Sequence, residues 1–324
     1  MPAISPLHIS ILVIAAAFSA LLHSSSRPAI AQQPLTCITR DLPNPIASLF
    51  PNNATGVLNA TLVVIPVPHS TARRLIPLQY GILEHAYRSL MPDFPEGMYP
   101  VLLQAAHDHD VQLKALGITI DDFSRIGLEF PFIDLLNDNH TSFRWAPAQL
   151  ITSTHRIALQ GSAAYGTVVS PATFRPACDA YDALPNGATF FGARSIDNGD
   201  AYAELEVSAI PDSVTGPYTI EMFRNITNQP TFANGSTCDQ MIRLFGTSMS
   251  RGAYEPVLVK GRVRVKGLAP LDGEKEVWDG VYGVQVATPF VENNYLDCSG
   301  LRGYDGAELE KRGVGDGLDT IDGL

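Results

Sequence analysis

Lysine is scarce in this sequence of 324 residues, and basic residues in general are outnumbered by acidic ones. Only five lysines occur, at positions 114, 260, 266, 275 and 311, and the formal net charge is −11. Nucleic acids and anionic membrane surfaces attract clusters of Lys and Arg. Neither is therefore expected as a partner. With 45% hydrophobic residues the chain can still bury a sizeable core.

Cysteine is also rare, and the sequence has no Cys-x-x-Cys pair, which argues against a thiolate zinc site or thioredoxin-like chemistry. No metal or cofactor is expected. The four cysteines are an even number, compatible with two disulfides formed in an oxidising compartment. The sequence allows three ways of pairing them. Our working hypothesis pairs Cys178 with Cys238 and Cys37 with Cys298.

Long hydrophobic runs are missing as well. The apolar run Ile9–Leu22 is shorter than the roughly 20 residues of a membrane span. A small-x-small cleavage site, Ala29-Ile30-Ala31, follows it, so residues 1–31 are interpreted as a signal peptide. An uncleaved anchor helix is the alternative. After cleavage the mature protein would have no membrane span.

Asn-x-Ser/Thr sequons indicate a eukaryotic secretory glycoprotein. None has proline in its middle position. Together with the signal peptide, their number favours secretion over chance occurrence. The predicted glycosylation sites are Asn53, Asn59, Asn139, Asn225 and Asn234.

Strand-like segments dominate the rest of the chain. Residues 32–55 form a Pro- and Asn-rich lead-in, 56–298 a single domain, and 299–324 a Gly- and Asp-rich tail expected to be flexible. The predicted fold is α+β, with a mainly antiparallel curved sheet or barrel-like core and a few short helices. The expected helices cover 69–77 and 236–249. The expected strands cover 56–68, 98–113, 125–136, 187–194, 201–210, 218–223, 255–268 and 278–290.

The run Ala-Ala-His-Asp-His-Asp at 105–110 suggests a metal site or acid/base chemistry. In a strand, His107 and His109 share one face while Asp108 and Asp110 share the other. A metal would need further ligands, for which His140, His155 and Glu129 are available without a telling spacing. An ordinary strand with one face toward solvent or a cavity is the favoured interpretation.

Familiar catalytic motifs are absent. Residues 246–250 fail the last position of a G-x-S-x-G elbow, and no dinucleotide-binding, P-loop or EF-hand motif occurs. The strand 258–267 places four cations on one face, namely Lys260, Arg262, Arg264 and Lys266. A half-buried strand with a solvated basic face is the favoured interpretation. Cations around an anionic ligand are the alternative.

Three segments together resemble the acetoacetate decarboxylase family over residues 56–292. They are "LNATLVVIPVPHSTARRLIPLQYGI", "YPVLLQAAHDHDV" and "THRIALQGSAAYG". In the third segment, Arg156 and Gly166 match the family's arginine and closing glycine. The resemblance is greatest to a divergent, secreted branch found in filamentous fungi. It implies a barrel-like fold with a small-molecule cavity.

The chain departs from this family where the chemistry lies. The family uses a lysine amine, with a pKa lowered by burial and a neighbouring cation, to form a Schiff base with a β-keto acid. The two adjacent lysines of the family correspond to Ala163 and Ala164, and the family's glutamate corresponds to Ile157. Schiff-base decarboxylation is therefore not expected.

The resemblance and strand parity suggest which residues line the cavity. His155, Arg156 and Glu129 are the catalytic candidates, and Arg156 would bind a carboxylate. Gln104, His107 and Tyr165 are the ligand-binding candidates. One hypothesis is a tailoring or accessory protein acting on a small organic acid or polyketide-like metabolite in fungal secondary metabolism. The other is a secreted binding or effector-like protein without catalysis. The sequence leaves the oligomeric state open.

Overall fold

The computed structural model describes residues 41–197, 200–211, 213–252, 255–268 and 277–304. All of them belong to a unit formed by residues 37–324. The predicted signal peptide, Cys37 and residues 305–324 lie outside this part. Among the described helices, none has the length and apolar character needed to cross a membrane.

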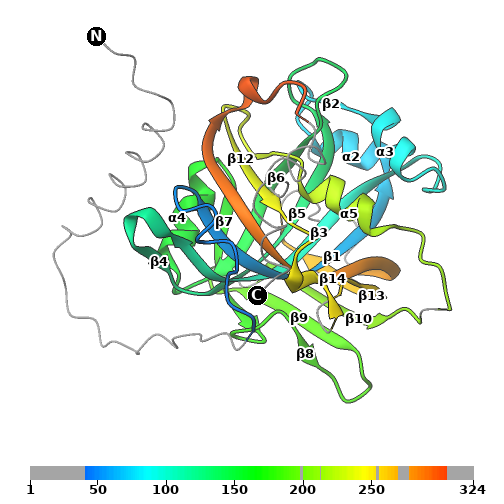
Figure 1. The fold of residues 1–324 in the computed structure, drawn as a ribbon. Coiled ribbons are helices and arrows are strands. Elements are labelled where there is room, and N and C mark those ends of the chain that lie inside the picture. The colour runs from blue at the N-terminus through cyan, green and yellow to red at the C-terminus, as the bar shows by residue number, and fades with distance from the viewer. Residues whose placement is uncertain (1–40, 198–199, 212, 253–254, 269–276, 305–324) are drawn as a thin grey trace, which may run out of the picture. The chain divides into compact units, whose positions relative to one another are not determined.

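Strands account for about half of the described chain and form one 14-stranded sheet (Figure 1). The helices are short. They are α2 (His69–Leu75), α3 (Glu84–Leu90), α4 (Arg156–Ala164) and α5 (Ile220–Thr227), with 3₁₀ turns at Lys114–Leu116, Ser248–Ser250 and Cys298–Leu301. The strands are β1 (Ala54–Pro68), β2 (Gly81–Ile82), β3 (Met98–Leu113), β4 (Ile118–Ile120), β5 (Phe123–Asp134), β6 (Phe143–Thr152), β7 (Val168–Arg175), β8 (Asp182–Ala183), β9 (Thr189–Ser195), β10 (Tyr202–Ala209), β11 (Thr231–Phe232), β12 (Thr237–Arg243), β13 (Val257–Lys266) and β14 (Val277–Asp297).

The hydrogen-bonded path through the sheet closes on itself twice. The first ring runs β14-β1-β3-β5-β6-β11-β12 and returns to β14. The second runs β14-β1-β3-β5-β6-β7-β9-β10-β13 and also returns to β14. Only the β6–β7 and β6–β11 pairings are parallel among those described, so the predicted mainly antiparallel curved sheet is confirmed.

The long strand β14 makes the double closure possible. Its first half pairs with β13 from Val257 to Arg264, and its second half pairs with β12 from Thr237 to Arg243. Strand β6 does the same on the other side, with β11 at Arg144 and with β7 further along. Strands β14, β1, β3, β5 and β6 are therefore common to both rings, and we call them the shared sheet.

The shared sheet is buried on both faces, which explains its near-continuous apolar sequences. In β1, every residue from Thr55 to Ile65 is buried, with no alternation of polar positions. The register pairs Leu62 with Gln104 and Asn59 with His107. Between Val57 and Ile65 of β1 and between Val101 and His109 of β3, even-numbered residues thus face the first ring and odd-numbered residues face the second ring.

Glycine is required at one point inside the first ring. A Cβ atom on Gly56 in β1 would lie 2.6 Å from Cζ of Phe290 and 2.9 Å from Cγ2 of Val111. Phe290 is fully buried and is paired with Arg243 across β14 and β12. The absence of a side chain at position 56 therefore leaves room for the Phe290 ring.

Two secondary-structure predictions are wrong. The segment 218–223 was expected to be a strand, but from Ile220 it forms α5, capped by the Thr219 hydroxyl, which accepts a hydrogen bond from the Met222 N–H at 3.1 Å. Residues 236–249 were expected to be a helix, but Thr237–Arg243 forms β12. Pairing with β14 and β11 on its two sides outweighs the helical pattern there.

The predicted disulfide pairing is also wrong. Cys238 is bonded to Cys298, with 5.1 Å between their Cα atoms. The register of β12 against β14 explains this, because Cys238 lies opposite Leu296, two residues before Cys298. Cys178 is disulfide-bonded as well.

The chain beyond Cys298 remains attached to the domain as far as Tyr304. The Gly303 N–H donates to the Thr141 hydroxyl at 2.8 Å, and the Tyr304 hydroxyl donates to the Asn228 carbonyl at 2.6 Å. These contacts hold the start of the Gly- and Asp-rich segment against the domain.

Candidate functional site

The interior of the first ring contains an unusual concentration of charge. Three arginines and four carboxyl groups project from the strands of this ring, where apolar side chains would be expected. Buried charges are costly unless they are paired or serve a ligand. This cluster is the candidate functional site. Its members are Asp108 on β3, Arg125 and Glu129 on β5, Arg144 on β6, Asp239 and Arg243 on β12, and Glu292 on β14, joined by the neutral Gln104 on β3.

Two of the arginines are fully engaged by carboxylates. Arg125 donates twice to Asp108, at 2.7 and 3.2 Å, and its Nη2 also lies 3.7 Å from the sulfur of Met241. Arg144 donates to Glu129 and, through Nε, to the Gln229 carbonyl at 2.9 Å. Within each pair the arginine and the carboxylate neutralise each other. The two hydrogen bonds that each arginine makes hold this side of the cluster rigid.

Arg243 differs because most of its guanidinium has no protein partner. The side chain is 1% exposed, and only Nη2 donates, to the Oε1 of Gln104. Its Nε and Nη1, and the Nε2 of Gln104, are buried without a hydrogen bond to any residue that the structure describes. Burial, followed by repulsion from Arg144 and Arg125, lowers the pKa of Arg243 to about 9, so it remains a cation at neutral pH.

The backbone around Arg243 is fixed by one side chain. The Arg243 N–H donates to Oδ1 of Asn228 at 2.8 Å, and Nδ2 of Asn228 donates back to the Arg243 carbonyl at 3.1 Å. Asn228 follows the end of α5 and is 1% exposed. This reciprocal pair positions the guanidinium on β12 without consuming any of its own donors.

The carboxyl groups of Asp239 and Glu292 form an acidic pair with perturbed pKa values. Both side chains are half-buried, unlike Asp108. Burial raises the pKa of Asp239 to about 6, although Arg144, Arg125 and Arg243 oppose the rise. Burial and then the charge of Asp239 raise the pKa of Glu292 to about 8. Near neutral pH the two carboxyls therefore carry about one proton between them.

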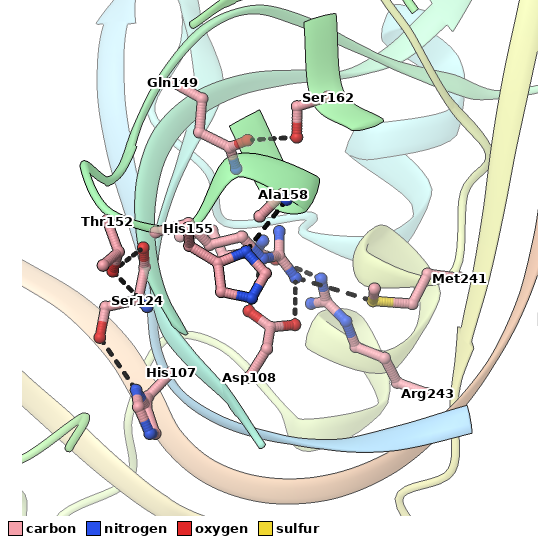
Figure 2. A network of polar contacts seen from close by, with 12 residues as sticks. His107, Asp108, Ser124, Gln149, Thr152, His155, Ala158, Ser162, Met241 and Arg243 are labelled. Atoms are coloured by element: carbon pink, nitrogen blue, oxygen red, sulfur yellow. Dashed lines mark hydrogen bonds and ion pairs between the residues drawn. The ribbon is translucent and has the colours of Figure 1, made fainter. Parts of the chain in front are cut away.

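His155 lies at the end of the cluster near α4. Its Nδ1 caps α4 by accepting a hydrogen bond from the Ala158 N–H, with 3.0 Å between the two nitrogens. Its ring packs on the Phe123 ring, with 4.6 Å between the ring centroids. Figure 2 shows the ring of His155 close to Asp108, with Arg243 and Met241 on the far side. Burial lowers the pKa of His155, and because Nδ1 is an acceptor the neutral ring carries its proton on Nε2.

The structure brings four of the six predicted site residues to the first ring. Gln104 and Glu129 belong to the charged cluster, His155 lies beside Asp108, and the Tyr165 hydroxyl donates to Asn294 of β14 at 2.7 Å. Two predicted residues are elsewhere. His107 faces the second ring, and Arg156, the first residue of α4, is exposed.

His107 and His109 share a face, and Asp108 lies on the opposite face, as predicted. Nδ1 of His107 lies 2.9 Å from the Ser124 hydroxyl, and the two imidazole rings stack at 6.3 Å (Figure 2 shows the former contact). No group of three or more metal-ligating residues occurs within the described ranges. Both histidines are fully buried within β3 of the shared sheet.

The positions that match the family's lysines lie on the surface of α4. Ala163 and Ala164 are exposed, and Ile157 is half-buried. Of the lysines within the described ranges, Lys114 and Lys260 are exposed and Lys266 is half-buried at the end of β13. No lysine that the structure describes is part of the charged cluster.

The basic stripe of β13 is a surface feature. Lys260, Arg262 and Arg264 are exposed, while Val259, Val263 and Val265 are buried. Arg262 donates to Asp279, and Arg264 lies 3.8 Å from Glu204. The solvated basic face is therefore confirmed.

The decisive residues that sequence reasoning missed are Arg125, Arg144, Arg243, Asp239 and Glu292. Arg144 and Arg243 lie between large apolar residues, in "FRWAP" and "MIRLF", and Arg125 is followed by an apolar residue in "SRIGLEF". A charged residue inside an apolar strand is the available signal, because such residues are seldom buried without a reason. The incorrect helix at 236–249 hid two of the five.

The predicted glycosylation sites differ in accessibility. Asn139 and Asn234 are exposed, and Asn53 and Asn225 are half-buried. Asn59 is 2% exposed in the middle of β1, and its Nδ2 donates to Asp41 at 2.5 Å. A glycan on Asn59 does not fit this fold, because its attachment atom faces the interior.

Comparisons with known proteins give distant structural similarities only. No protein-family profile and no curated protein sequence matches the chain. Among solved structures, the enduracididine biosynthesis enzyme MppR has a TM-score of 0.41 and 10% identity, covering 84% of this chain and 98% of that one. Acetoacetate decarboxylase from Legionella pneumophila has a TM-score of 0.40 and 10% identity, over 76% and 84%. An acetoacetate decarboxylase-like enzyme from Sphingomonas wittichii has a TM-score of 0.38 and 9% identity, over 75% and 92%. The second and third of these structures carry the name of the acetoacetate decarboxylase family, which the sequence resembles.

Proposed function

We propose that the first ring binds a small organic acid and that the acidic pair Asp239 and Glu292 moves a proton on it, without a Schiff base. Arg243 carries the proposal. It is a buried cation whose Nε and Nη1 have no partner among the described residues. Each of these unpaired N–H groups can donate to an oxygen of a bound anion, and a carboxylate is an acceptor suited to guanidinium donors.

The remaining charges of the cluster support a ligand with a single carboxylate. Arg125 and Arg144 are already paired with Asp108 and Glu129. Only Arg243 is left to accept a new anion, and a second carboxylate on the ligand would meet Asp239 and Glu292. A monocarboxylic acid with an otherwise neutral body is therefore the expected ligand.

The acidic pair supports proton transfer as the chemistry. General acid–base catalysis is most effective when the pKa of the catalytic group lies near the working pH. Asp239 at about 6 and Glu292 at about 8 lie on the two sides of neutrality. His155, neutral and protonated on Nε2, adds a hydrogen-bond donor at the same end of the ring.

In its cellular setting, we propose a secreted tailoring or accessory protein for a polyketide-like or other small acid in fungal secondary metabolism. The signal peptide, the sequons and the disulfides predicted from the sequence support this setting. A non-enzymatic binding or effector-like protein is the second candidate. The complete pairing of Arg125 and Arg144 favours it, because those ion pairs hold the site rigid and need no substrate.

The test is calorimetric titration of the full chain with small monocarboxylic acids and their methyl esters at pH 7. Acetoacetate and its ester are the first probes. Acids should bind and esters should not, and Arg243→Gln should abolish binding while Arg156→Gln, at an exposed position, should not. Equal binding of acid and ester would overturn the proposed carboxylate site.

The enzyme and the binding protein are separated by proton exchange. NMR in D₂O follows loss of the α-proton signals of a bound keto acid. Exchange that requires Glu292 or Asp239 supports catalysis. Tight binding with no exchange, unchanged in Glu292→Gln, supports the binding protein.

A further inference from the structure

A short hydrogen-bonded chain links Tyr295 and Tyr165 to Asn294, two residues after Glu292 on β14. The Tyr295 N–H donates to the Tyr165 hydroxyl oxygen at 3.1 Å, and that hydroxyl donates to Oδ1 of Asn294 at 2.7 Å. Asn294 lies two residues after Glu292 on β14, and its side chain lowers the pKa of the Glu292 carboxyl. Glu292, Asn294 and Tyr295 all belong to the end of β14, whereas Tyr165 is the residue that ends α4.

The direction of each hydrogen bond in this chain follows from the one before it. Because the Tyr165 oxygen accepts the Tyr295 N–H, its own proton points to Oδ1 of Asn294. With Oδ1 facing Tyr165, the Nδ2 of Asn294 is the group that is left to donate to Glu292. Burial raises the pKa of Tyr165 far above its ordinary value, so the hydroxyl keeps its proton at every physiological pH.

The backbone at Tyr295 is distorted in a way that serves this chain. Tyr295 has a φ of 57°, a left-handed conformation that is strained for an aromatic residue. The register of β12 against β14 shifts here, since Cys238 pairs with Leu296 but Gln240 pairs with Asn293. The rings of Tyr295 and Tyr165 are stacked, with 5.3 Å between their centroids and 12° between their planes. This stacking holds the irregular backbone of β14 in place.

We infer that Tyr165 is a positioning residue that acts through Asn294 to hold the Glu292 carboxyl and to set its affinity for a proton. This deepens the proposed function, on which its catalytic meaning rests. The other charged groups that act on Glu292 are Asp239 and Asp108, which favour its protonated form, and Arg125, which favours the carboxylate. A donated hydrogen bond from Asn294 stabilises the carboxylate as well, so its loss raises the pKa of Glu292 further.

The test measures the titration of Glu292 in the ligand-free full chain, by ¹³C NMR of its carboxyl carbon, assigned with Glu292→Gln. Tyr165→Phe keeps the stacked ring and removes the hydroxyl, and it should raise the pKa of Glu292 by roughly half a unit. Tyr181→Phe is the matched control. Its buried hydroxyl donates to the Ala60 and Val286 carbonyls instead, so the Glu292 titration should not change.

A double-mutant cycle decides whether Asn294 is the intermediary. Asn294→Ala should raise the pKa of Glu292 as Tyr165→Phe does, and the double variant should add little. Additive shifts, or an unchanged Glu292 titration in a folded Tyr165→Phe protein, would overturn the inference. If Tyr165→Phe does not fold, the Asn294 side-chain amide of the unaltered protein supplies the readout. Its proton shifts must follow the Glu292 titration, and independence would equally overturn the inference.

These outcomes do not depend on ligand binding. A protein that binds no acid can still show the predicted shift, and a protein that binds acids can fail to show it. The inference and the proposed function are therefore tested separately.

Discussion

Arg243 and Gln104 lie on different strands of the first ring and share one hydrogen bond, from Nη2 to Oε1. Among the residues that the structure describes, Nε and Nη1 of Arg243 and Nε2 of Gln104 have no partner. Arg144, on β6, is by contrast satisfied by Glu129 and Gln229. Two buried arginines of one ring are thus in opposite energetic situations. This difference leads to the first prediction.

Replacing Arg144 by Met should destabilise the protein far more than replacing Arg243 by Met. Arg144→Met leaves Glu129 as an unpaired buried charge, a change that costs about 3–5 kcal/mol in unfolding free energy. Arg243→Met removes an under-partnered cation and one bond to Gln104, so the change should stay within about 1 kcal/mol. Urea unfolding of the two variants checks this. A larger loss in Arg243→Met would contradict the assigned pairing.

Glu292 should make the protein less stable as the pH rises. Its pKa in the folded state, about 8, lies above the ordinary value of 4.5. The folded state therefore holds the proton more tightly, and stability falls as the pH increases between these two values. Glu292→Gln should remove this dependence and be more stable at pH 8 by about 1–2 kcal/mol, a figure reduced for the partial exposure of the side chain. Thermal unfolding between pH 4.5 and 8.5 measures it, and an unchanged slope would refute it.

His107 should make the protein less stable as the pH falls below 6.5. Burial lowers its pKa in the folded state below the ordinary value of 6.5. The unfolded chain then binds the proton more tightly, so this contribution to stability is present above pH 6.5 and is lost as the pH falls through lower values. His107→Gln should flatten the decline of the melting temperature between pH 6.5 and 4.5. Arg156→Gln, at an exposed position, serves as the control. A decline that is as steep in His107→Gln as in the unaltered protein would argue against His107 as a source.

Borohydride reduction in the presence of acetoacetate should trap no lysine adduct in the first ring. Lys114, Lys260 and Lys266 lie outside the charged cluster, and Lys260 is engaged with the ring of Tyr282 at 4.9 Å. Peptide mass spectrometry after reduction is the measurement, with bovine serum albumin as a control for nonspecific labelling. A specific acetoacetate adduct on one of these lysines would contradict this prediction and support the Schiff-base mechanism. The adduct counts as specific if acetoacetate also protects that lysine from a general amine-labelling reagent.

Peptide mapping of the non-reduced protein should recover Cys238 linked to Cys298. The bond closes a loop with a sequence separation of 60 residues, and removing it by Cys238→Ser with Cys298→Ser should cost about 2–4 kcal/mol. Recovery of a Cys178–Cys238 peptide instead would contradict the register of β12 against β14.

Much of the fold was predictable from local sequence. The β-branched run of β1, the apolar first half of β3 and the alternation of charge and valine along β13 indicate those strands directly, because burial on two faces or on one face leaves a clear pattern. The double closure was not predictable. It depends on β14 changing partners midway, and the sequence from Val277 to Asp297 does not signal where β13 ends and β12 begins as its neighbour.

The site was predicted in part for a similar reason. Strand parity and the family resemblance led to Gln104 and Glu129, which both lie in the charged cluster. The same reasoning placed Arg156 in the cavity, where the structure has an exposed helix residue. The arginines that occupy the interior come from β5, β6 and β12, and the closure of β12 on β14 brings Arg243 across to Gln104 of β3.

The shared sheet gives β3 an unusual tolerance and an unusual vulnerability. Gln104 and Asp108 belong to one interior and His107 to the other, so substitutions at even and odd positions between Val101 and His109 change the packing of the two rings independently. A one-residue insertion in β3 would exchange the contents of both at once, because every side chain beyond it would change face. Substitutions can therefore change the chemistry of this protein during evolution, whereas insertions and deletions in its central strands would disrupt both rings.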